Sequence, residues 1–153
     1  MSDSVFMNEA LKLAKTASDE GEVPVGAVIV FQGQIVGKGQ NRREKEQNSL
    51  CHAEIEAINE ACRVLKRWRL DDCTLYVTLE PCPMCTGAII NSRLGKVVFG
   101  AYDEKAGSMG TLVNLCDLDY NHRPGITGGY MEKECSDIIT EFFATLRKSK
   151  AEV

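Results

Sequence analysis

The apolar residues near the start of the chain recur at helical spacing. Five of them share one face of an amphipathic helix: Phe6, Ala10, Leu13, Ala14 and Ala17. Gly21 would end this helix. The same spacing predicts a second helix over His52–Leu65 and a long one over about 131–148. A shorter helix is expected over Pro83–Ser92, because proline suits a first helical turn.

Short runs of β-branched residues between these helices predict strands. Val25–Phe31 and Ile35–Gly39 flank Gln32-Gly33-Gln34, a pattern typical of a β-hairpin with a glycine-containing turn. Leu75–Leu79 and Lys96–Gly100 have the same character and predict two further strands. The chain therefore alternates strands with helices after an opening hairpin.

Two stretches are polar or glycine-rich and are expected to be loops. One is Asn41–Cys51, and the other is 101–130, where the apolar patch Leu112–Leu118 indicates a helix. The order of elements predicts an α/β fold in which a mixed sheet is covered by helices on both faces. The 153 residues have room for a single domain, 1–153. A site is expected at the sheet edge where strands lead into helix N-termini.

Composition narrows the class of protein. The chain is 44% hydrophobic and 26% charged, which is ordinary for a globular domain. It has no basic and apolar leader, and its longest apolar run is Ala27–Phe31, so we expect a soluble, cytoplasmic protein without a membrane span. The net charge of −4 argues against a protein that coats nucleic acid, although basic clusters occur at 42–43, 63–69 and 147–150.

Two short motifs carry the candidate chemistry. Seven cysteines without a secretion signal argue against a disulfide framework, and only Cys82 and Cys85 have metal-ligand spacing. The other motif is His52-Ala53-Glu54, at the start of the second helix. Alone, each motif has ordinary explanations: a capping histidine, a redox pair, half of a structural zinc site or two buried thiols. Together they supply three zinc ligands and a carboxylate.

The spacing of these residues indicates where a metal would lie. Cys82 and Cys85 share one face of a helical turn. His52 and Glu54 are about 200° apart around a helix, so they cannot both contact an object beside it. They can both contact an object that lies beyond its N-terminal end. A metal between two helix N-termini fits both pairs, and three ligands leave the fourth zinc position open, as in catalytic sites. If His122 were the fourth ligand, the site would be structural; a hydrogen-bonding role in a loop is expected for His122 instead.

The paired motifs are the signature of zinc-dependent cytidine and adenosine deaminases. Over residues 6–148 the chain resembles the bacterial tRNA-specific adenosine deaminases of the cytidine/deoxycytidylate deaminase superfamily. The resemblance is carried by six segments: Glu22–Val28, Cys51–Ile55, Leu75–Cys82, Arg93–Ala101, Asn121-His122-Arg123 and Glu141-Phe142-Phe143.

This resemblance implies a three-layer α/β/α cytidine-deaminase-like fold with a five-stranded mixed sheet, whose fifth strand lies near Ile126–Tyr130. It also implies a homodimer with one Zn²⁺ per subunit, and hydrolytic deamination of adenosine to inosine at the wobble position of an arginine tRNA anticodon. In that reaction Glu54 moves the protons, and ammonia is released.

The resemblance also implies substrate contacts. Asn41 would hydrogen-bond the base, Pro24 and Val25 would form an apolar wall, and Ala53 would contact the base. Four residues are candidates for gripping the tRNA anticodon stem-loop: Asp103, Lys105, Phe143 and Arg147. From the residues alone, Asn41 is also explained as a turn residue and Phe143 as a core residue.

Two alternative functions remain open from the sequence. A deaminase of a free nucleobase or nucleoside, of guanine or cytosine type, would share the Pro-Cys-Pro-Met-Cys motif and would need no basic surface. A non-catalytic binding module stabilised by zinc would tolerate the loss of Glu54. An assay with the RNA and with free bases separates these functions.

Overall fold

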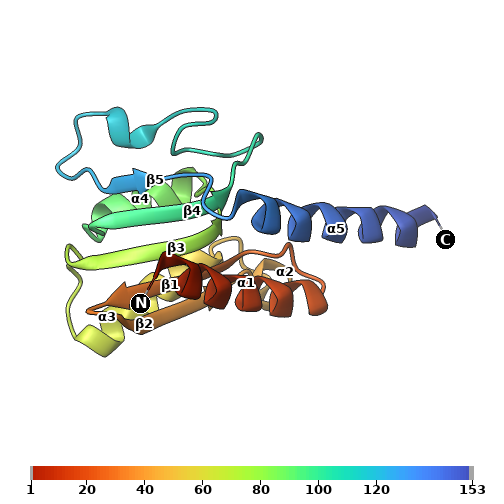
Figure 1. The fold of residues 1–153 in the computed structure, drawn as a ribbon, viewed down its shortest axis with the longest axis horizontal. Coiled ribbons are helices and arrows are strands. Elements are labelled where there is room, and N and C mark those ends of the chain that lie inside the picture. The colour runs from red at the N-terminus through yellow and green to blue at the C-terminus, as the bar shows by residue number, and fades with distance from the viewer. Residues whose placement is uncertain (1, 152–153) are drawn as a thin grey trace.

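A five-stranded sheet forms the centre of the structure, a computed structural model that describes residues 2–151 (Figure 1). The elements in chain order are α1 (Asp3–Asp19), β1 (Gly26–Phe31), β2 (Gln34–Gln40), α2 (Arg43–Glu46), α3 (Ala53–Leu65), β3 (Cys73–Leu79), α4 (Pro83–Asn91), β4 (Lys96–Ala101), the 3₁₀ turn η1 (Leu115–Asp117), β5 (Gly125–Thr127) and α5 (Glu132–Ala151).

The strand order is β2-β1-β3-β4-β5. β1 pairs antiparallel with both β2 and β3, whereas β3, β4 and β5 are parallel. As a result, the ends of β2, β3 and β4 and the start of β1 meet at one edge of the sheet. The expected α/β fold with a five-stranded mixed sheet is confirmed.

Helices cover both faces of the sheet, which gives three layers (Figure 1). Successive residues of β1 alternate between the faces: Ala27 and Ile29 pack toward α3 and α4, and Val28 and Val30 pack toward α1 and α5. Both faces of this strand are therefore buried, which agrees with the helices expected on both faces of the sheet.

Glycines let α3 lie unusually close to β2. A Cβ added to Gly39 would lie 2.0 Å from the carbonyl oxygen of Ala53, and one added to Gly37 would lie 2.3 Å from that of Ala57. The small alanine face of α3 and these glycines allow backbone to meet backbone. This contact fixes the first turn of α3, which carries Glu54, against the sheet.

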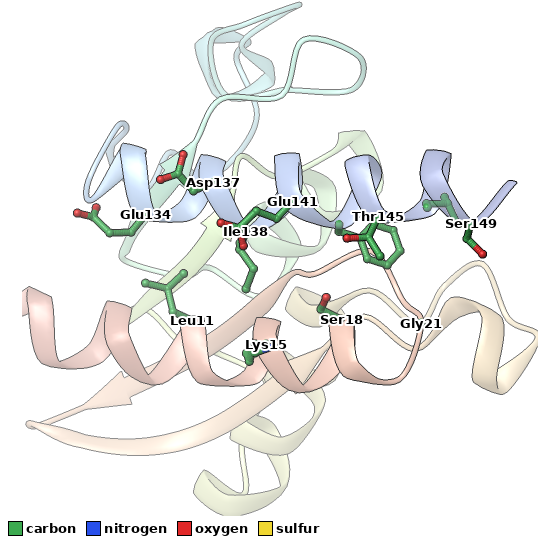
Figure 2. Close-up of a pocket in the computed structure, with 12 residues that line it drawn as sticks. Leu11, Lys15, Ser18, Gly21, Glu134, Asp137, Ile138, Glu141, Thr145 and Ser149 are labelled. Atoms are coloured by element: carbon green, nitrogen blue, oxygen red, sulfur yellow. The ribbon is translucent and has the colours of Figure 1, made fainter. Parts of the chain in front are cut away.

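On the opposite face, α5 runs beside α1 and extends beyond the sheet (Figures 1 and 2). A groove of about 610 Å³ lies between the two helices, where Leu11 and Lys15 of α1 face Ile138 and Glu141 of α5. None of the residues that the sequence assigned to the site lines this groove.

Two segments expected as simple loop or helix differ from the expectation. The loop over Asn41–Cys51 contains the short helix α2, whose first amides are bonded by the Glu22 carboxylate. The apolar patch Leu112–Leu118 forms only the three-residue turn η1. The Asn114 side chain caps the start of this turn by accepting the amide of Cys116, and the chain is extended again at Leu118.

The fifth strand and the last helix begin at shifted positions. β5 spans Gly125–Thr127 rather than 126–130, since Gly129 adopts a φ of +77° and turns the chain out of the extended conformation. Met131 has a φ of +51°, so α5 begins one residue later than expected. The amide of Tyr130 still bonds the Phe99 carbonyl oxygen.

Candidate active site

The sheet edge where β2, β3 and β4 end collects the candidate site residues. Cys82 follows β3, Asp103 follows β4 and Asn41 follows β2. β1 begins at the same edge, so Val25 also lies there. The first turn of α3 adds His52 and Glu54, as the two-helix arrangement predicted.

His52, Cys82 and Cys85 form a metal-ligand cluster. Their ligand atoms lie within 4.8 Å of one another, and His52 Nδ1 is 3.5 Å from the Sγ atom of each cysteine. His52 is the N-cap of α3 and Cys82 the N-cap of α4, where Cys82 Sγ accepts the Cys85 amide. One imidazole nitrogen and two sulfurs at this separation are a donor set that suits zinc.

The electrostatics of the cluster favour a thiolate. A hydrogen bond from the Cys85 thiol, followed by one from His52, lowers the pKa of Cys82 to about 4. The same hydrogen bond with Cys82 and burial raise the pKa of Cys85. The hydrogen bond to Cys82 also raises the pKa of His52. Cys82 is therefore the thiol of the cluster that ionises more readily, and the thiolate is the form that binds a metal ion.

Glu54 lies beside the cluster and is only 4% exposed. Burial raises the pKa of Glu54 to about 7, because the ionised carboxyl loses its hydration. A carboxyl with a pKa near neutrality can both accept and donate a proton at physiological pH. The structure therefore brings together the three candidate ligands and a proton-transfer group, as the two motifs suggested.

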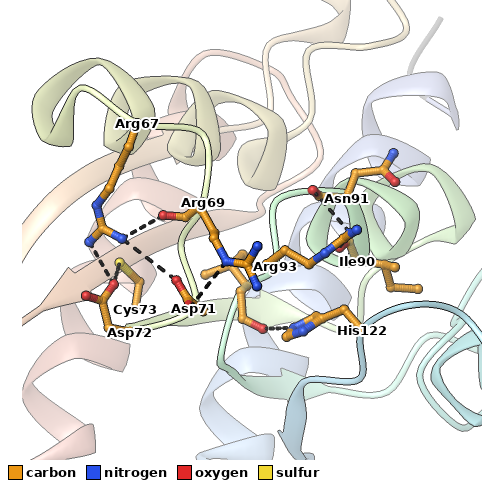
Figure 3. A network of polar contacts seen from close by, with 10 residues as sticks. Arg67, Arg69, Asp71, Asp72, Cys73, Ile90, Asn91, Arg93 and His122 are labelled. Carbon is orange, nitrogen blue, oxygen red and sulfur yellow. Dashed lines mark hydrogen bonds and ion pairs between the residues drawn. The ribbon is translucent and has the colours of Figure 1, made fainter.

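His122 lies away from this cluster. Its Nε2 atom lies 2.6 Å from the Leu94 carbonyl oxygen, a contact drawn in Figure 3. Within residues 2–151, no other group of three or more histidine, cysteine or acidic side chains is placed to hold a metal. The hydrogen-bonding role expected for His122 is confirmed, and His122 does not belong to the ligand cluster.

A cavity of about 200 Å³ opens beside the cluster. Its lining includes three of the residues predicted to contact the base, Asn41, Val25 and Ala53, together with His52 and Glu54. Pro24 is buried next to the cavity and is not part of its lining, which Val23 completes instead. The apolar part of the lining thus includes Val23, Val25 and Leu79.

Both ends of the Asn41 amide bond the backbone. Its Nδ2 donates to the Val23 carbonyl oxygen at 3.2 Å, and its Oδ1 accepts the Arg43 amide at 3.1 Å. The turn role is therefore present. One Nδ2 proton and one Oδ1 lone pair are left for a ligand in the cavity that Asn41 lines.

A second cavity, of about 460 Å³, adjoins the first and shares Val23, Leu79 and Asp103 with it. Lys105 and the half-buried Phe143 also line it. Three of the four candidates for RNA contact are thus brought together. Arg147 lines neither cavity and lies exposed near the end of α5.

The basic cluster at 63–69 is partly neutralised. Arg67 pairs with Asp72 at 2.7 Å, and Arg69 pairs with Asp71 at 3.5 Å, contacts drawn in Figure 3. This segment joins α3 to β3 at the edge of the sheet opposite the cavity. Part of its charge is therefore engaged within the protein, and the segment lies away from the candidate site.

Two buried glutamates at the site escaped the sequence reasoning. Glu22 is 2% exposed and Glu80 is 1% exposed, and each accepts hydrogen bonds from a loop that lines the cavity. Each borders an apolar run: Glu22 precedes Val23-Pro24-Val25, and Glu80 follows β3. This position could have identified them as buried glutamates with hydrogen-bond partners, since a glutamate is seldom buried without partners.

Comparisons with known proteins agree with this geometry. The profile of the MafB19-like deaminases matches residues 1–147. The tRNA-specific adenosine deaminase of Bacillus subtilis (strain 168) is 52% identical, over 97% of this chain and 92% of its own. That of Streptococcus pyogenes serotype M1 is 43% identical, over 95% of this chain and 85% of its own.

Solved structures of two kinds of deaminase share the fold. One from a study of A-to-I editing by tRNA:A34 deaminases at the wobble position has a TM-score of 0.86 and 38% identity, covering 88% of this chain and 99% of that one. The guanine deaminase of Bacillus subtilis has a TM-score of 0.65 and 32% identity, covering 97% and 95%. Within residues 2–151, no helix has the length and apolarity to cross a membrane. The chain belongs to the MafB19-like deaminases and, among them, to the tRNA-specific adenosine deaminases.

Proposed function

We propose that this deaminase converts adenosine to inosine at the wobble position of an arginine tRNA anticodon, with one zinc ion per chain. The observation that carries the proposal is the placement of buried Glu54 beside the open cluster of His52, Cys82 and Cys85, in one cavity. Burying an ionisable carboxyl costs folding free energy. Proton transfer gives a reason for this cost at Glu54, whereas a non-catalytic binding module would not need the carboxyl.

His52, Cys82 and Cys85 would hold the zinc ion, which supplies a water molecule acidified toward neutral pH. Glu54 would accept the first proton of the attacking water while the water oxygen forms a bond to C6, and would deliver that proton to N1 of the adenine. It would then move the second proton of the water to the amino group on C6. The C6–N bond breaks, the amino group leaves as ammonia, and the water oxygen stays on C6. Adenosine and water thus give inosine and ammonia.

The cavity walls suit a flipped-out purine. Val23 and Val25 offer an apolar face for the ring, and Ala53 a small surface at the first turn of α3. Asn41 would hydrogen-bond the polar edge of the base with its free proton and lone pair. Pro24 would contribute indirectly, by holding Val23 and Val25 in place from its buried position.

The adjoining cavity would receive the nucleotides next to the target. Phe143 offers a ring for stacking, and Lys105 a cation for phosphate, while Asp103 lies at the junction of the two cavities. Arg147, exposed on α5, would reach the phosphates of the stem.

The chain would act as one domain, 1–153, in the cytoplasm and as a homodimer. The single sheet and its two buried cores support one domain. Exposed apolar side chains on the segment between β4 and β5 offer a surface for a second copy: Leu112, Val113, Leu118 and Tyr120.

One assay tests the function against its alternative. The protein is incubated separately with an arginine tRNA anticodon stem-loop, free guanine, cytidine and adenosine, and the products are analysed by mass spectrometry. We expect inosine in the RNA and little turnover of the free compounds. The similarity to a guanine deaminase makes guanine the informative competitor. Deamination of guanine without inosine in the RNA would overturn the proposal.

A further inference from the structure

Two buried carboxylates lie at the sheet edge that carries the site. Glu22 precedes β1 and Glu80 follows β3. Because these two strands are antiparallel neighbours, the start of β1 and the end of β3 meet at one edge. Neither glutamate lines the cavity beside the metal ligands.

The Glu80 carboxylate holds the segment that follows β4. Its Oε1 accepts the amide of Asp103 at 3.1 Å and the hydroxyl of Thr111. Its Oε2 accepts the amides of Met109 at 3.0 Å and Thr111 at 3.1 Å. All four partners donate, which is the arrangement that an ionised carboxylate requires.

The chain wraps so closely around this carboxylate that Gly107 has no room for a side chain. A Cβ at Gly107 would lie 2.5 Å from Glu80 Oε1. The segment held in this way, 103–111, contributes Asp103 and Ala106 to the cavity wall. Glu80 therefore acts on the cavity indirectly, by holding the backbone of a segment that lines it.

Glu22 has the same relation to another part of the cavity wall. Its Oε1 accepts the amide of Glu44 at 3.1 Å and its Oε2 accepts that of Lys45 at 2.7 Å. These amides belong to α2, whose first residue, Arg43, lines the cavity together with Asn41. The two glutamates thus hold two segments that come from different parts of the sequence and line one cavity.

We propose that Glu22 and Glu80 are positioning residues of the deaminase, each fixing one of the two segments that wall the substrate cavity. Glu22 fixes 41–47 and Glu80 fixes 103–111. The proposal rests on the proposed function, because it takes this cavity as the place where the nucleotide binds. Neither glutamate touches the substrate or moves a proton.

The isosteric variants Glu80→Gln and Glu22→Gln test this directly. An amide keeps the size of the carboxyl but turns one acceptor oxygen into a donor that faces other donors. Hydrogen exchange of the zinc-loaded protein, read by mass spectrometry, reports on each segment separately. Each variant serves as the control for the other, and zinc content is measured in both.

We expect Glu80→Gln to speed exchange about tenfold in 103–111 and to leave 41–47 unchanged, which is the effect of weakening hydrogen bonds to a charged group. Glu22→Gln should do the reverse. In both variants zinc content should stay at the wild-type level. The KM for the stem-loop should rise about tenfold, with kcat changed less than about threefold.

If either variant speeds hydrogen exchange by the same factor in both segments and in the sheet, the glutamates support only global stability, and the proposal is overturned. An unchanged KM would also overturn it. If Glu80→Gln does not fold, Thr111→Val removes one hydrogen bond to Glu80, and Thr111→Ser should restore the wild-type exchange and KM. If guanine proves to be the substrate, the function fails but the exchange pattern and the KM for guanine still decide this proposal.

Discussion

The Nδ1 atom of His52 lies 3.5 Å from the Sγ atom of Cys82, although 30 positions separate the two residues in the chain. Each residue is the N-cap of its helix, so the two positive helix ends face one cluster. The hydrogen bonds in this cluster lower the pKa of Cys82, and the cluster can therefore be probed chemically as well as by metal binding.

Cys82 should be alkylated first in the metal-free protein. With a pKa of about 4, its thiol is ionised throughout pH 5–8, so its reaction with iodoacetamide should be nearly independent of pH in that range. An ordinary thiol with a pKa near 8.5 gains about tenfold in rate per pH unit there. Peptide mapping at low reagent gives the rate for each cysteine. A rate for Cys82 that climbs steeply with pH would contradict this charge state.

Metal analysis should find one zinc ion per chain in the wild type and in His122→Ala, and none in Cys82→Ala. Cys82→Ala removes one of the three ligands, whereas His122 lies outside the cluster and hydrogen-bonds the Leu94 carbonyl oxygen. His122→Ala should therefore cost about 1 kcal/mol in the free energy of unfolding and no zinc. Chelation should abolish activity, and added zinc should restore it. Loss of zinc from His122→Ala would show that the site is a closed structural one.

Glu54→Ala should retain zinc and lower kcat by at least about a hundredfold, because general acid–base catalysis contributes this much or more. Glu60→Gln on the same helix is the matched control, since the one hydrogen bond of the Glu60 side chain within residues 2–151 is to the amide of Lys38 on β2. Its activity should match the wild type. Substantial turnover by Glu54→Ala, measured as inosine in the stem-loop, would exclude Glu54 as the proton carrier.

In the metal-free protein, Glu54→Gln should raise stability at alkaline pH. The folded pKa of Glu54 is raised to about 7, so the ionised carboxyl destabilises the fold above that pH. At about 1.4 kcal/mol per pKa unit the difference amounts to a few kcal/mol, and it should disappear as the pH falls from 7 toward 4.5. Urea unfolding at several pH values measures it; equal stability at pH 8 would contradict the burial cost.

Gly39→Ala should displace α3 from the sheet. The new Cβ would meet the Ala53 carbonyl oxygen at 2.0 Å, so we expect a loss of about 1–3 kcal/mol in the free energy of unfolding. Because the first turn of α3 carries Glu54, kcat/KM should fall by about tenfold or more. Gly125→Ala, whose Cβ has neighbours only at 3.8 Å, is the control and should be nearly neutral. Equal effects of the two variants would contradict this account.

Periodicity predicted the helices and the first four strands because their apolar positions are buried as regular spacing requires. It failed at three places. α2 is bonded by the Glu22 carboxylate, a partner from another part of the chain that no local pattern reports. The patch 112–118 and β5 are shorter than expected for local reasons, because Asn114 caps the three-residue turn η1 and Gly129 turns the chain after β5.

For the site, the sequence by itself determined the chemical groups: an imidazole, two thiols and a carboxyl, at spacings that only helix N-termini reconcile. Only the tertiary structure decided what surrounds them. The antiparallel pairing of β1 with β3 brings Glu22 and Glu80 to the edge that holds Cys82, and places Val23 rather than Pro24 in the cavity wall. Ligand spacing is a property of one or two turns of chain, whereas cavity walls and buried hydrogen bonds depend on strand order, which local sequence does not encode.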